Sequence, residues 1–117
     1  MQRMGAPGEP DAAGSGEAAQ LQLSIGPAGE VVPVGQVDIG NARLLHSALA
    51  TAESDPILQV DLRRVTYLDS AAVTVLYAHA HKPMRILARP DSAVAKVLQI
   101  CGFSRVAQVE LVEETGS

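Results

Sequence analysis

The dipeptide Asp69-Ser70 stands where a strand-like run passes into a helical pattern, and it offers the clearest chemistry in this sequence. The residues before it, Val65–Leu68, are mostly apolar. An apolar stripe with helical spacing follows, at Val73, Leu76 and Ala80. The pattern therefore predicts that Ser70 is the N-cap or a first-turn residue of a helix.

A serine at that position has two interpretations. The start of a helix carries unpaired N–H groups and a partial positive charge, which favour a phosphate by roughly 0.3 to 2 kcal/mol. Phosphorylation of Ser70 would add about 1.5 to 2 negative charges beside Asp69, and it would repel an acidic or apolar partner surface. In the other interpretation Ser70 only caps the helix. The residues alone do not choose between the two.

The other candidate residues favour structural roles. His79 and His81 alternate along a helix, so their side chains point about 200° apart, and we interpret both as surface residues near a helix C-terminus. We expect His46 to be a partly exposed helix residue and Cys101 to be a small buried hydrophobe. No Gly-x-Ser-x-Gly elbow surrounds Ser70, and no glycine loop follows a strand. We therefore predict a protein that is not an enzyme and that holds no metal or cofactor.

The length and composition of the chain predict one small domain. The chain has 117 residues, of which 47% are hydrophobic, and this is enough for one core but not for two. The net charge of −4 and the scattered basic residues argue against nucleic-acid binding. One cysteine excludes an internal disulfide, and the first residues lack a secretory pattern, so we expect a cytoplasmic protein. The longest apolar stretch, residues 71–80, is too short to insert into a membrane.

Composition and alternation predict the domain limits and the strands. Glycine and proline among acidic residues predict a disordered tail over residues 1–19, and residues 113–117 are expected to form a flexible C-terminal tail. The predicted domain is residues 20–112. Its strands are expected at residues 21–25, 31–34, 57–62, 84–88 and 106–112. Pro33 cannot donate a ladder hydrogen bond, so the second strand is expected at a sheet edge or at a bulge.

Three helices are predicted between these strands. The first follows Asn41, which is placed to cap it, and its apolar face is Leu44, Leu45, Ala48 and Leu49. The second begins at Asp69-Ser70. The third has the apolar face Val94, Val97, Leu98 and Cys101, and it ends at Gly102 in a left-handed conformation, closed by an apolar contact of Phe103. This order implies an α/β fold with a mixed, partly parallel sheet.

Three stretches, in order along the chain, resemble the signature segments of STAS domains. Gly35–Asp38 precedes the first helix, Val60–Val73 contains an Asp-Leu strand and then Asp69-Ser70, and Pro90–Phe103 is similar to the family's last long helix. The resemblance spans Leu21 to about Val109. It implies a STAS-like mixed sheet of four to five strands with three to four helices packed on it.

The resemblance is to the anti-sigma-factor antagonists among STAS domains, and it implies a function. In those proteins a partner anti-sigma serine kinase phosphorylates the serine after the aspartate, here Ser70, and the unmodified form binds that kinase and frees a sigma factor. This partner switching regulates sigma-factor-dependent transcription. The residues expected around the phosphosite and in partner binding are Asp38, Asn41, Asp69, Ala71, Ala72 and Thr74.

Two departures from the family pattern leave other functions open. Ala71 and Ala72 stand where the family usually has a small polar residue and a glycine. The connection after the second helix, residues 79–83, is several residues shorter than usual in the family and lacks its glycine-rich turn. A STAS subunit that is not phosphorylated, in a lipid transporter or a sensory complex, is the first alternative. A sensor that binds a nucleotide or a lipid is the second. The oligomeric state is not predicted.

Overall fold

The computed structural model describes residues 21–113, so the predicted N-terminal tail and residues 114–117 lie outside the described residues. In chain order the elements are β2 (Leu21–Ile25), β3 (Val31–Val37), α3 (Ala42–Ala52), β4 (Leu58–Asp61), β5 (Val65–Leu68), α4 (Ser70–Ala78), β6 (Met84–Ala88), α5 (Ala93–Ile100), the 3-10 helix η2 (Phe103–Arg105) and β7 (Gln108–Leu111). The three predicted helices and five predicted strands are each present, with boundaries shifted by a few residues.

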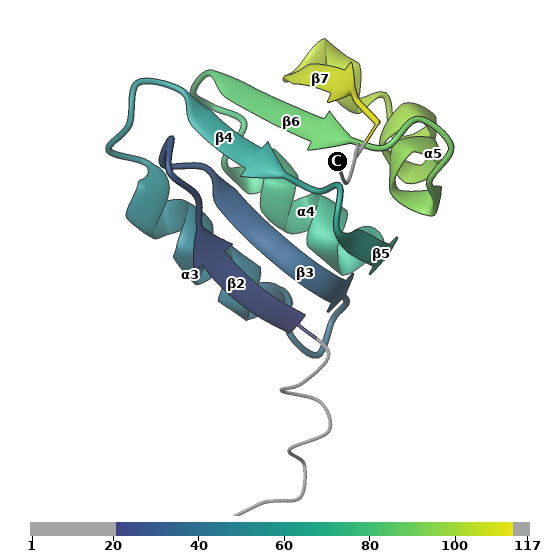
Figure 1. The fold of residues 1–117 in the computed structure, drawn as a ribbon, viewed down its shortest axis with the longest axis horizontal. Helices are drawn as coiled ribbons and strands as arrows, with labels where there is room; N and C mark the ends of the chain where they lie inside the picture. The colour runs from purple at the N-terminus through teal and green to yellow at the C-terminus, as the bar shows by residue number, and fades with distance from the viewer. Residues whose placement is uncertain (1–20, 114–117) are drawn as a thin grey trace, which may run out of the picture.

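The strands form one mixed sheet in the order β2-β3-β4-β6-β7, and β5 also pairs with β3. β2 runs antiparallel to β3, whereas the other pairs are parallel. Figure 1 shows α3 and α4 together behind the sheet, while the near face of β2, β3, β4 and β6 carries no helix. The predicted α/β class with a mixed sheet is confirmed.

The sheet has six strands, one more than the upper limit of four to five that we predicted. The additional strand is β5, which sequence analysis treated only as the approach to a helix. β4 pairs with β3 at a single position, Val31 with Val60, and then leaves it. β5 takes over along the second half of β3, from Gly35 to Val37. A short strand whose partner is shared in this way has no separate sequence signal.

Pro33 lies in an interior strand, so the expected edge position is wrong. β3 has β2 on one side and both β4 and β5 on the other. Successive residues of a strand direct their N–H groups to opposite sides, so residues 33 and 35 face the same side, and Gly35 donates to the Arg64 carbonyl on the β4 and β5 side. The backbone nitrogen of Pro33, which carries no hydrogen, therefore faces the β4 and β5 side of β3. It lies between the residue that pairs with β4 and the residues that pair with β5, so no hydrogen bond of the sheet is lost. The register shift lies between Gly35 and Gln36.

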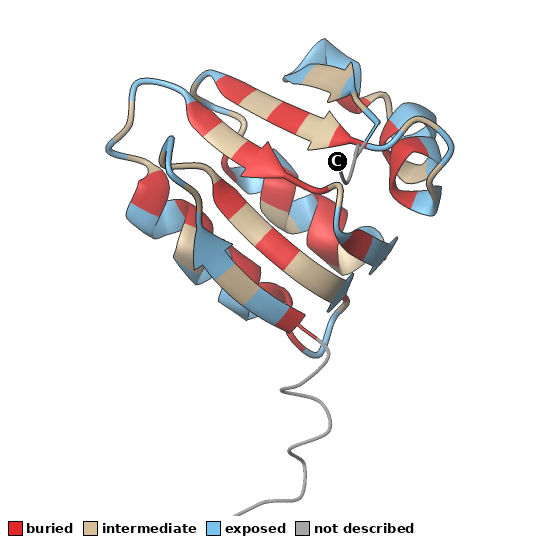
Figure 2. Cartoon of the chain, viewed as in Figure 1, coloured by how far each residue is buried: buried red, intermediate tan, exposed pale blue. Residues whose placement is uncertain are grey.

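The core lies between the sheet and the helices and is almost entirely aliphatic. Figure 2 shows buried residues alternating with less buried ones along β3 and β6, as expected for strands with one covered face, whereas β4 ends in two buried residues, Val60 and Asp61. Phe103 is fully buried and meets the ring of Tyr77 edge-on, with centroids 4.7 Å apart. Gly102 has a φ of 67°, which confirms the left-handed ending predicted after α5.

Two predicted core residues are exposed. Leu44 is 40% exposed because the buried face of α3 is centred on Leu45, Leu49 and Ala52. Cys101 is exposed as well, since α5 ends at Ile100 and Cys101 already belongs to the turn that follows. The predicted buried thiol is therefore wrong.

Ion pairs brace the sheet face that carries no helix. Arg63 binds Asp61, and Arg85 binds Glu110 on the neighbouring strand, each at 2.9 Å. Burial acts to raise the pKa of Asp61, but the hydrogen bonds from Arg63 outweigh it and hold that pKa below its ordinary value. Arg85 likewise lowers the pKa of Glu110. Along residues 21–113, no helix has the length and apolar character needed to cross a membrane.

Candidate functional site

Asp69, and not Ser70, is the N-cap of α4. Its backbone is extended, with φ −101° and ψ −175°, and its Oδ1 accepts a hydrogen bond from the Ala72 N–H at 3.0 Å. Ser70 is the first helical residue and is exposed. Within residues 21–113 its hydroxyl makes no hydrogen bond to another protein group. The aspartate thus performs the capping that either residue could have supplied, and the serine side chain is left accessible.

The second oxygen of Asp69 holds a loop that comes from the end of β3. Asp69 Oδ2 accepts a hydrogen bond from the Ile39 N–H at 3.0 Å, and the Asp69 N–H donates to the Val37 carbonyl at 3.2 Å. One carboxylate therefore joins the start of α4 to the loop of residues 38–41. These segments are thirty residues apart in sequence.

The loop itself is closed by its own side chains. Asp38 Oδ1 accepts from the Gly40 N–H at 2.9 Å, and Asn41 Oδ1 accepts from the Asp38 N–H at 2.9 Å. The Asn41 Nδ2 group donates to the Gln36 carbonyl at 3.0 Å. Asn41 occupies the N-cap position of α3, but it makes no capping hydrogen bond to that helix, so the predicted cap is wrong. Its side chain points back into the loop because its backbone, with φ −130° and ψ 7°, is not extended.

The other predicted site residues divide into accessible and buried groups. Thr74 is exposed, and its hydroxyl donates to the Ser70 carbonyl at 2.9 Å, so it stabilises the first turn of α4 from within. Ala71 is half-buried. Ala72 is fully buried, so its methyl group faces the core and only its backbone N–H serves the site. The structure therefore brings Asp38, Asn41, Asp69 and Ser70 into one loop-and-helix unit.

Apolar side chains stand exposed beside this unit. Ile39 is 83% exposed although its backbone is held by Asp69. Tyr67, two residues before Asp69, is 49% exposed. We call Ile39, Tyr67, Asp69 and Ser70 the switch surface.

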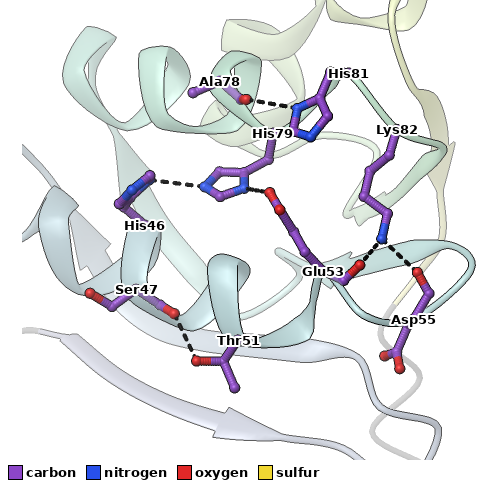
Figure 3. A network of polar contacts seen from close by, with 9 residues as sticks. All are labelled: His46, Ser47, Thr51, Glu53, Asp55, Ala78, His79, His81 and Lys82. Atoms are coloured by element: carbon purple, nitrogen blue, oxygen red, sulfur yellow. Dashed lines mark hydrogen bonds and ion pairs between the residues drawn. The ribbon is translucent and has the colours of Figure 1, made fainter.

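Sequence analysis missed a second polar cluster, between α3 and the end of α4 (Figure 3). His79 is only 3% exposed, so its interpretation as a surface residue is wrong. Its Nδ1 contacts the Glu53 carboxylate, and its Nε2 lies 2.9 Å from Nδ1 of His46. The hydrogen bond from His79 lowers the pKa of Glu53. No sequence pattern signals this cluster, because its members lie 26 and 33 residues apart.

Metal coordination has no candidate in the described part of the chain. No group of three His, Cys, Asp or Glu side chains converges there in a way that could hold an ion. The described residues thus offer two candidate sites, the switch surface with the Ser70 hydroxyl and the Glu53-His79-His46 cluster.

A mixed sheet covered by helices on one face, with an exposed serine as the first residue of α4, defines a class of small α/β domain. The chain matches the STAS domain family over residues 25–116, and it belongs to that family. No match was found among curated proteins.

Two solved structures show the same fold. An anti-sigma factor antagonist from Mycobacterium paratuberculosis has a TM-score of 0.66 at 20% identity, covering 79% of this chain and 85% of that one. The anti-sigma factor antagonist SpoIIAA in its unphosphorylated form has a TM-score of 0.57 at 18% identity, covering 82% of this chain and 90% of that one. This chain is therefore a STAS domain with the fold of anti-sigma factor antagonists.

Proposed function

We propose that this protein is an anti-sigma-factor antagonist and that an anti-sigma serine kinase phosphorylates it on Ser70. The observation that carries the proposal is the exposed, unbonded hydroxyl of Ser70 on the first residue of α4. Asp69 has already satisfied the cap, so the hydroxyl has no structural task that would keep it from a kinase. The shared fold with two anti-sigma factor antagonists supports the same function.

The chemistry assigns Ser70 the part of a substrate residue. A serine hydroxyl needs a base before it can attack a phosphoryl group. Both carboxylates of this unit are bound to backbone N–H groups, Asp69 to Ile39 and Ala72, and Asp38 to Gly40. Neither is hydrogen-bonded to Ser70. The base, the ATP and the metal ion that such a transfer uses are therefore expected from the kinase, and the proposed role of this protein is to bind that kinase.

In this mechanism the switch surface changes charge without changing its fold. In the unmodified protein the exposed side chains of Ile39 and Tyr67 offer apolar contact, and the exposed Ser70 hydroxyl is neutral. A phosphate on Ser70 would add about 1.5 to 2 negative charges within one residue of Asp69. The helix start tolerates that charge in the free protein, but burying it in an interface next to a carboxylate costs several kcal/mol. Phosphorylation is then expected to release the kinase, which again binds its sigma factor.

The test is phosphorylation in vitro. The protein is incubated with ATP and the anti-sigma serine kinases of its own organism, and the modified residue is located by peptide mass spectrometry. We expect one phosphate, on Ser70, and none on the Ser70→Ala variant. Ser92→Ala is the matched control, because Ser92 also lies at a helix start but uses its hydroxyl as the cap.

Two results would contradict the proposal. One is the absence of phosphate on Ser70 with every anti-sigma serine kinase that binds the protein. The other is a phosphate elsewhere in the chain that persists in Ser70→Ala. In either case the protein would function as a STAS domain without this switch.

A further inference from the structure

The Glu53-His79-His46 cluster places a buried imidazole, His79, between a partly exposed carboxylate and an exposed imidazole (Figure 3). The Glu53 carboxylate contacts Nδ1 of His79, and Nε2 of His79 lies 2.9 Å from Nδ1 of His46. His79 is buried, whereas His46 is exposed on α3. The cluster lies at the far end of α4 from Ser70 and takes no part in the function proposed above.

These contacts decide which nitrogen of each neutral ring carries the proton. A carboxylate can only accept, so His79 must carry a proton on Nδ1. The Nε2 of neutral His79 is then an acceptor, and His46 must donate to it from Nδ1. Nε2 of His46 is left with a free lone pair. Within residues 21–113 that nitrogen makes no hydrogen bond.

An exposed nucleophile, a base behind it and a carboxylate behind the base form the arrangement that activates nucleophiles in enzymes. We propose that His46 is a phosphoacceptor, modified on Nε2 by phosphoryl donors with a good leaving group. This second modification site does not depend on Ser70.

The step balances with the groups at hand and one donor. For phosphoramidate, the Nε2 lone pair of His46 attacks phosphorus, and the P–N bond of the donor breaks. Ammonia leaves with that electron pair, since the donor nitrogen already carries the required proton. The positive charge that develops on the His46 ring is removed when its Nδ1 proton moves to Nε2 of His79. The resulting His79 imidazolium is stabilised by the Glu53 carboxylate that it contacts.

His81 supplies an internal reference for the relay. It is exposed, and its Nδ1 lies 3.1 Å from the Ala78 carbonyl, so its Nε2 is also left free. A carbonyl oxygen cannot take up the proton that the reaction displaces, whereas His79 can. The two imidazoles thus resemble each other in exposure and tautomer and differ in the base behind them.

The experiment labels the full chain with potassium phosphoramidate at pH 8 and follows phosphate on each histidine by mass spectrometry and by phosphorus NMR. Acid-labile, alkali-stable phosphate identifies phosphohistidine. We expect His46 to react at least about tenfold faster than His81, a modest fraction of what a positioned base contributes in enzymes. His79→Phe should lower the His46 rate to that of His81, and His46→Gln should remove the fast phase.

Because His79 is buried, His79→Phe could fail to fold, so Glu53→Gln is the second variant. Glu53 is partly exposed, and glutamine keeps its length and an acceptor oxygen while removing the charge. We expect a several-fold slower reaction at His46 and no change at His81. Equal rates at His46 and His81 in the unaltered protein, or an unchanged His46 rate in Glu53→Gln, would overturn the proposal.

Discussion

The helices α4 and α5 are capped at their N-termini by different types of residue. At α5, Ser92 is the cap, and its hydroxyl accepts from the Ala95 N–H at 3.0 Å and donates to the Arg89 carbonyl at 2.7 Å. At α4, Asp69 is the cap, and the serine that follows it has a free hydroxyl. The aspartate before Ser70 therefore caps the helix and leaves the serine hydroxyl available for the phosphorylation proposed above. A serine that must hold its helix cannot be modified without loss of the cap.

The two N-caps also differ in how far along the sequence their hydrogen-bond partners lie. The hydroxyl of Ser92 bonds only residues three positions away. The carboxylate of Asp69 bonds Ala72 locally with one oxygen and Ile39, from a distant loop, with the other. The start of α4 is thus joined to the exposed loop of residues 38–41, so the surface there is formed by two segments that are distant in sequence.

The largest effect is expected from a charge placed at the free serine. Ser70→Glu should weaken binding to the anti-sigma serine kinase by about 2 to 5 kcal/mol, because it places like charge beside Asp69 in the interface. Calorimetry on the purified pair measures this loss. Ser24→Glu, on an exposed residue of the helix-free sheet face, is the matched control and should bind like the unaltered protein. Equal affinities for the Ser70 and Ser24 variants would remove the distinction between the two helix starts.

The second prediction concerns the loop of residues 38–41, which Asp69 holds at the start of α4. Ile39→Asp should weaken kinase binding by about 2 kcal/mol, the loss typical of an apolar anchor in an interface. Its free energy of unfolding should change by less than about 0.5 kcal/mol, since the side chain is 83% exposed. Ile100→Asp on α5, where the side chain is 84% exposed, is the control. If both variants bind normally, the loop has no part in the interface.

The third prediction tests the double role of Asp69. Asp69→Ala removes the cap of α4 and the hydrogen bond to Ile39, and it should lower the free energy of unfolding by about 1 to 2 kcal/mol. Asp69→Asn retains a capping oxygen and should lose less. Urea unfolding of the three proteins gives the comparison. An alanine variant as stable as the unaltered protein would show that Asp69 does not cap α4.

The fourth prediction compares the serines directly. Ser92→Ala should destabilise the fold by about 1 kcal/mol, the usual effect of losing a cap. Ser70→Ala should change stability by less than about 0.5 kcal/mol, because no hydrogen bond is lost. Thermal and urea unfolding both report the difference. A Ser70→Ala variant that loses as much as Ser92→Ala would mean that the Ser70 hydroxyl is also structural.

The smallest expected effect comes from the opposite end of α4, where the Glu53 carboxylate contacts His79. The contact with His79 lowers the pKa of Glu53, so this contact stabilises the fold above the ordinary pKa of a glutamate, near 4.5. That contribution is lost as the pH falls below 4.5 through the lowered pKa. In urea melts between pH 7 and pH 3, Glu53→Gln should lose less stability on acidification than the unaltered protein. Parallel curves would contradict the contact.

Features that depend on near neighbours could be predicted from the sequence. The first-turn position of Ser70, the left-handed Gly102 and most strands follow from local spacing, capping and turn preferences. Features that depend on segments distant in sequence could not. Pro33 reads as an edge residue, yet it lies inside the sheet because two different strands share the side to which its missing donor points.

The start of α4 at Asp69-Ser70 could be predicted from residue types alone, because a cap and a helical stripe are local patterns. The folded structure was needed to show which of the two residues is the cap and what else that residue binds. The Asp69 contact to Ile39 spans thirty residues, and the partners of His79 lie 26 and 33 residues away. Such contacts exist only after the sheet has brought the ends of β3 and β5, and the helices α3 and α4, side by side.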